Sequence, residues 1–159
     1  MIDAECGIVL EAISVFHIAR GDALGSYLVS EYKLASRKPR PMISVTTIAE
    51  ILRVVHRKKY KAYEIETVKR LLGKAYHFVP VLDEIVEEFA LLGAATDLNG
   101  EPRYSSKVWV AATCSAIAKG TRKAALLTCD SDYLAFKKQG LQVEYVDPSP
   151  YRKGFASIA

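Results

Sequence analysis

Short apolar runs alternate with longer amphipathic stretches along this chain. The runs at 7–10, 43–45 and 124–128 are typical of buried strands, and 141–146 alternates like a half-buried strand. A short extended piece at 77–81 contains Pro80, which is typical of an edge strand. Apolar residues at helical spacing predict helices at 12–19, 23–35, 48–58, 62–76, 82–95, 106–119 and 131–138.

Strands that are separated by helical crossovers predict a central parallel β-sheet flanked by helices on both faces. We therefore expect an α/β protein with a single domain over 1–147, followed by a C-terminal tail at 148–159. A length of 159 residues is enough for one domain with a core of its own. The composition, 50% hydrophobic and 25% charged, is that of an ordinary globular protein.

Charge and cysteine content narrow the function classes only slightly. The net charge of +4 permits a nucleic-acid partner without requiring one. No apolar run approaches the ~18 residues of a membrane span, and the N-terminus lacks the features of a signal peptide. Cys6, Cys114 and Cys129 lack CxxC spacing, so we expect reduced core cysteines in a cytoplasmic protein. The absence of a glycine-rich phosphate loop counts against a nucleotide-binding domain.

Carboxylates follow three of the predicted strands. Glu11 follows 7–10, Glu50 lies in the helix after 43–45, and Asp130 and Asp132 follow 124–128. The carboxyl ends of parallel strands share one edge of the sheet, so we expect these side chains to converge there. Since like charges repel, a divalent cation such as Mg²⁺ or Mn²⁺ would stabilise the cluster.

Each of these acids also has a purely structural interpretation. Thr47 and Glu50 fit a capping box, in which the threonine caps the helix and the glutamate bonds back to it. Asp130 fits a helix N-cap, while Asp132 and Glu11 fit the first turn of a helix. Their shared edge, and no single residue among them, therefore indicates a site.

Four segments carry motifs in a fixed order along the chain. They are Leu10–Asp22 (LEAISVFHIARGD), Ile43–Leu52 (ISVTTIAEIL), Pro102–Thr113 (PRYSSKVWVAAT) and Leu126–Tyr133 (LLTCDSDY). Together they resemble the PIN domain family, the fold of the VapC toxins and many related RNA nucleases, over 7–147. The resemblance implies a metal-dependent ribonuclease that cleaves RNA. It also implies a homodimer, and a protein antitoxin as partner of VapC-type members.

The resemblance assigns the metal and the catalysis to Glu11, Glu50, Asp130 and Asp132. These residues would hold Mg²⁺ or Mn²⁺, which would activate water for attack on a phosphodiester. Glu11 replaces the family's first aspartate, and Ile13 replaces a polar residue.

The third motif departs most from the family, because Ser105 and Lys107 stand where it has two aspartates. One interpretation places the Lys107 ammonium among Glu11, Glu50 and Asp130 as a substitute for the ion. In another, Lys107 binds an RNA phosphate at the helix N-terminus, with Ser105 and Thr128 as further substrate-binding residues. In a third, its side chain extends into solvent.

Two functions follow from this pattern. The first is a PIN-like metal-dependent ribonuclease of the VapC kind. The second is a degenerate PIN domain, impaired in catalysis, that binds RNA or a protein without cleaving. A lysine in place of an acid favours the second, and it leaves open whether any metal binds.

Overall fold

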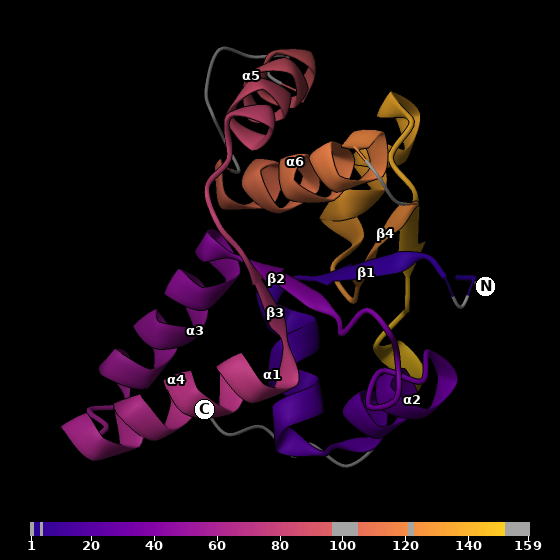
Figure 1. Cartoon of the computed structure of the whole chain (residues 1–159). Coiled ribbons are helices and arrows are strands. Elements are labelled where there is room, and N and C mark those ends of the chain that lie inside the picture. Colours follow the sequence, from indigo (N-terminus) through magenta and orange to yellow (C-terminus); the bar gives the residue numbers. More distant parts are fainter. Residues whose placement is uncertain (1, 4, 97–104, 121–122, 152–159) are drawn as a thin grey trace.

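The computed structural model describes residues 2–3, 5–96, 105–120 and 123–151, apart from the side chains of residues 96 and 105. Its sheet contains five parallel strands in the order β3-β2-β1-β4-β5 (Figure 1). The strands are β1 (Gly7–Leu10), β2 (Met42–Ser44), β3 (His77–Val79), β4 (Ala124–Thr128) and β5 (Val143–Tyr145). The predicted parallel α/β fold is confirmed, and β3 is an edge strand as expected.

Helices cover both faces of the sheet, with α5 and α6 above it and α1 to α4 below it in Figure 1. Their bounds are α1 Ala12–Arg20, α2 Ala23–Glu31, α3 Val45–Arg57, α4 Ala62–Ala75, α5 Asp83–Thr96 and α6 Ser105–Gly120. Two 3₁₀ segments complete the described chain, η1 (Ser131–Gln139) and η2 (Ser149–Tyr151).

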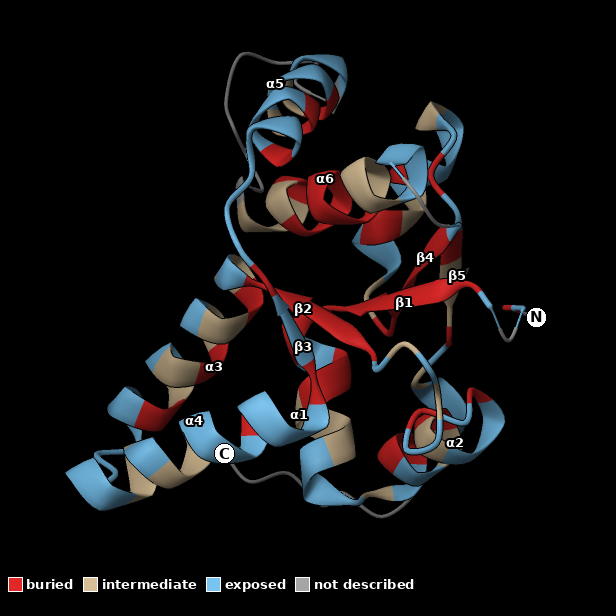
Figure 2. Cartoon of the chain, viewed as in Figure 1, coloured by how far each residue is buried: buried red, intermediate tan, exposed pale blue. Residues whose placement is uncertain are grey.

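Alternate residues of the central strands feed two separate cores. Ile8 and Leu10 of β1 pack with α1 to α4, whereas Val9 packs on the opposite side with α5, α6 and η1. Figure 2 shows the central strands buried throughout, which is expected for a parallel sheet covered on both faces. A change of one residue in register would exchange the two cores, so this pattern fixes the alignment of the strands.

The start of α3 differs from the sequence prediction. The helix begins at Val45, and its N-cap is Ser44, whose Oγ accepts a hydrogen bond from the Thr47 N–H at 3.2 Å. The predicted capping box with Thr47 as the cap is therefore wrong. Thr47 is fully buried and its hydroxyl donates to the Leu10 carbonyl at 3.4 Å, which ties α3 to β1.

The C-terminal ends of the strands meet at one edge. Leu10 pairs with both Ile43 and Leu127, and Thr128 pairs with Tyr145. The residues that follow these positions therefore share that edge, which is where the sequence placed the candidate site. The segment after β5 also reaches that edge, because Asp147 and Ser149 line a cavity together with Asp130. Tyr151 of η2 packs against Tyr27 of α2 with ring centroids 5.2 Å apart.

Candidate functional site

Glu11 lies directly after β1 and is buried, with 2% of its surface exposed. As the N-cap of α1, its carboxylate accepts hydrogen bonds from the backbone N–H groups of Ile13 and Ser14. Oε1 also accepts from the Ser14 hydroxyl at 2.5 Å and from the Cys129 N–H at 3.4 Å. Burial raises the pKa of Glu11, and these hydrogen bonds oppose that rise. Both carboxylate oxygens are thus engaged by the protein itself.

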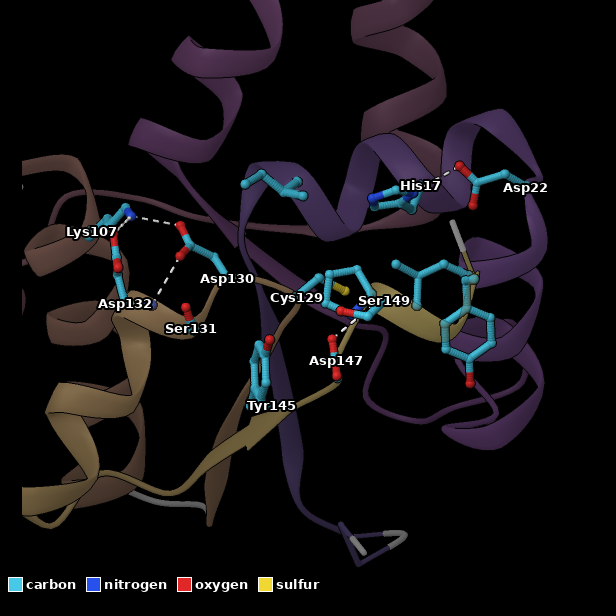
Figure 3. A pocket seen from close by; sticks show the side chains of 14 residues that line it. His17, Asp22, Lys107, Cys129, Asp130, Ser131, Asp132, Tyr145, Asp147 and Ser149 are labelled. Carbon is cyan, nitrogen blue, oxygen red and sulfur yellow. Dashed lines mark hydrogen bonds and ion pairs between the residues drawn. The ribbon is translucent and has the colours of Figure 1, made fainter. Parts of the chain in front are cut away.

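Lys107, in the first turn of α6, points at the two aspartates that follow β4 (Figure 3). Its Nζ lies 2.6 Å from Oδ2 of Asp130 and also pairs with Oδ2 of Asp132. Burial acts to lower the pKa of Lys107, but the hydrogen bonds to both aspartates leave it raised above its ordinary value. The ammonium therefore stays charged and serves as a cation between two carboxylates.

Asp130 combines the two roles that the sequence left open. Its Oδ1 accepts the backbone N–H of Asp132 at 3.0 Å and so caps η1, while Oδ2 faces Lys107. Thr128 holds this turn in place, since its buried hydroxyl accepts the Asp130 N–H at 3.0 Å. Thr128 thus positions Asp130. Thr128 itself does not line the cavity described below.

The pKa of Tyr133, in η1, is affected by the charges of all four predicted acids. The phenol is buried, and burial is the largest cause of its raised pKa. The negative charges of Glu11, Glu50, Asp130 and Asp132 raise that pKa further. All four acids therefore act on the same phenol through their charge. Lys107 Nζ lies 5.9 Å from the centre of the same ring.

A cavity of about 420 Å³ opens beside the Lys107 pairs. Lys107, Asp130 and Asp132 line one end of it, and His17 and Asp22 line the other (Figure 3). The cavity is also lined by Asp147 and by Cys129, whose pKa burial raises to about 11, so that the thiol stays protonated at neutral pH.

The sequence analysis missed the pair of His17 and Asp22. Nδ1 of His17 lies 2.8 Å from Oδ2 of Asp22, while Oδ1 accepts the Gly25 N–H at 2.9 Å. Burial acts to raise the pKa of Asp22, but these hydrogen bonds lower it below its ordinary value. The available signal was the Arg-Gly-Asp turn, in which Gly21 has φ 61° and brings Asp22 back to the end of α1.

The resemblance implies Mg²⁺ or Mn²⁺ at this edge, but the donor set does not fit a divalent ion as folded. Both oxygens of Glu11 accept protein hydrogen bonds, and Asp130 and Asp132 each bind the Lys107 ammonium. Across the described residues no group of three or more His, Cys, Asp or Glu side chains is arranged to hold a metal. Ser105 begins α6, but its side chain and the preceding motif residues 102–104 lie outside the described residues.

Known structures resemble this fold over most of their length. VapBC-1 from nontypeable Haemophilus influenzae matches with a TM-score of 0.67 and 15% identity, over 87% of this chain and 96% of that one. The chain has the PIN-domain fold. VapBC2 from Rickettsia felis, solved bound to a DNA fragment from its promoter, matches with a TM-score of 0.67 and 19% identity, over 88% of this chain and 98% of that one. VapBC-5 from Mycobacterium tuberculosis, a member of a family of toxin–antitoxin systems, matches with a TM-score of 0.55 and 18% identity, over 89% of this chain and 98% of that one.

At the level of sequence, no protein-family model and no curated protein shows significant similarity to the chain. Identities of 15–19% show the fold alone, and a shared fold does not by itself give this chain the chemistry of those proteins. None of the helices in the described part is long and apolar enough to cross a membrane.

Proposed function

We propose that this chain is a PIN-fold domain that acts by binding a protein partner, in the manner of a toxin–antitoxin pair, and does not cleave RNA through a divalent ion. The observation that carries the proposal is the double ion pair of Lys107 with Asp130 and Asp132. This ammonium already supplies Asp130 and Asp132 with a positive counter-charge. The similar structures are VapBC systems, and this supports a protein as the partner.

The charges lining the cavity favour a protein over RNA. Asp22, Asp130, Asp132 and Asp147 line it together with Lys107 and His17, which leaves a net negative wall. RNA phosphates within a Debye length of about 8 Å would be repelled by that wall, whereas basic side chains of a protein would be attracted.

Two exposed apolar side chains on α4, Tyr63 and Leu71, supply the contact surface. Leu72 is the one buried residue of this helix, and α4 is mostly solvent-exposed in Figure 2. Tyr63 and Leu71, at 66% and 57% exposed, share a helix face with Thr67 at intervals of four residues. Exposed apolar side chains on one face of a helix offer an apolar contact to a partner protein.

A photo-crosslinking experiment tests partner binding. A crosslinking amino acid at Thr67 should capture one protein in cells, and Leu71→Glu should abolish the capture by placing a charge in the apolar contact. Leu91→Glu on α5 is the matched control, because Leu91 is also exposed, at 62%, but lies on another helix. Equal capture by the Leu71 variant and the wild type would refute α4 as the docking surface.

A metal-dependent ribonuclease is the second candidate function. It is favoured by the four predicted acids, Glu11, Glu50, Asp130 and Asp132, whose charges all act on Tyr133. Labelled single-stranded RNA should stay intact with the folded wild type in Mg²⁺ or Mn²⁺ if our proposal is correct. Cleavage that needs the metal, stops with a chelator and is lost in Glu50→Gln would establish the ribonuclease instead.

A further inference from the structure

Lys107 occupies an unfavourable position for a cation. It lies in the first turn of α6, where the helix dipole repels positive charge, and only 22% of its side chain is exposed. The repulsion between Lys107 and the α6 dipole is therefore offset by other groups. These are the two aspartates of the turn between β4 and η1. A residue placed at such a cost indicates that the acids need a positive charge at this point.

We infer that Lys107 is a tethered counter-ion that takes the place of a divalent cation, and that removing its charge turns the same acids into a divalent-cation site. Lys107 carries this role whether or not a protein partner binds. The inference rests on the proposed function in one respect: both require that the wild type does not cleave RNA with a metal ion.

Charge repulsion explains why a vacancy at Lys107 would recruit a cation. Without the ammonium, Asp130 and Asp132 direct two carboxylates at one point, and the Asp130 side chain is only 16% exposed. Glu11 and Glu50 add negative charge around the neighbouring Tyr133. Carboxylates that are directed at one point repel one another without a counter-charge, and a divalent ion supplies two positive charges where lysine supplies one.

The chemistry of the acids indicates which ions would fit. Carboxylate oxygens are the ligands that the hard cations Ca²⁺, Mg²⁺ and Mn²⁺ prefer. The cavity of about 420 Å³ next to the pair leaves room for the water molecules that would complete the coordination.

The wild type should exclude these ions, because the ammonium cannot leave the site by diffusion. A metal would have to displace a charged group that is attached to α6 and hydrogen-bonded to both aspartates.

The decisive variant is Lys107→Met, which keeps most of the side-chain length and removes the charge. Thermal unfolding is measured in a chelator and then in 1 mM Ca²⁺, Mn²⁺ or Mg²⁺. We expect the wild type to be unaffected by metal. We expect the variant to bind one ion per chain with a Kd about 100-fold below the metal concentration used. Binding of that strength raises the free energy of unfolding by about 2.7 kcal/mol. For a domain of this size that corresponds to a rise in Tm of roughly 5–10 °C.

Two controls isolate the acids from other causes. Lys107→Met/Asp130→Asn removes one of the converging carboxylates, so its Tm should not respond to metal. Lys119 also lies on α6, and its Nζ is 2.5 Å from Oε1 of a single carboxylate, Glu88. Lys119→Met breaks that pair, so it should lower the Tm, and added metal should not raise the Tm again.

Direct binding provides the second readout, as the loss of the free Mn²⁺ signal in electron paramagnetic resonance. Equal Mn²⁺ binding by the wild type and Lys107→Met would overturn the inference, and so would a folded Lys107→Met without a metal response. If that variant does not fold in chelator, Mn²⁺ during refolding must recover it, and failure there also overturns the inference. None of these outcomes depends on crosslinking at Thr67, so partner binding is tested separately.

Discussion

Gly25 of α2 should be essential for the packing of the first two helices. A Cβ at this position would lie 2.0 Å from the His17 carbonyl oxygen and 2.8 Å from the Ile18 nitrogen. Real Cβ atoms essentially never approach closer than 3.0 Å, so in Gly25→Ala the backbones of α1 and α2 must separate by about 1 Å (3.0 − 2.0). That movement also pulls Asp22 away from His17 at the end of the cavity.

The size of the effect follows from three contributions. Overpacking costs about 1–3 kcal/mol, and loss of a hydrogen bond to a charged group costs about 1.5–3 kcal/mol. Alanine's better helix propensity returns roughly 1 kcal/mol. We therefore expect Gly25→Ala to lower the free energy of unfolding by about 1.5–5 kcal/mol, as measured by urea denaturation.

Gly73→Ala is the matched control for this prediction. Gly73 is also helical, in α4, but a Cβ there has no heavy atom within 4 Å. This substitution should stabilise the protein by about 0.5–1 kcal/mol through helix propensity alone. If Gly25→Ala were as stable as Gly73→Ala, the close approach of α1 and α2 would be refuted.

Two further predictions concern the acids. Asp22→Asn should flatten the acid limb of the stability curve: the lowered pKa of Asp22 contributes stability that is present above its unfolded value of 3.8 and is lost as pH falls through its folded pKa. Urea unfolding at pH 7 and at pH 3 checks this, and an equal loss at both would contradict it. Asp130→Asn should cost roughly 1–3 kcal/mol and Asp132→Asn about 0–1, because their side chains are 16% and 49% exposed. The reverse order in denaturant unfolding would show that Asp132 is the main partner of Lys107.

Local pattern was sufficient to predict most of the fold. Apolar runs at 7–10 and 124–128 gave buried strands, and helical stretches between strands gave a parallel sheet. The position of Asp130 and Glu11 at one edge followed from that topology, because parallel strands end on the same side. What failed was the exact start of α3, since Ser44 and Thr47 are both good caps and only the length of β2 decides between them.

The sequence by itself determined the fold and which residues reach the edge of the sheet, because hydrophobic periodicity is a local property of the chain. Only the tertiary structure decided what those residues do there. Lys107 meets Asp132 across 25 positions, Glu11 bonds Cys129 across 118, and Gly25 allows Asp22 to meet His17. The interaction between two charges depends on their distance and burial, and neither is encoded in the local pattern around either residue.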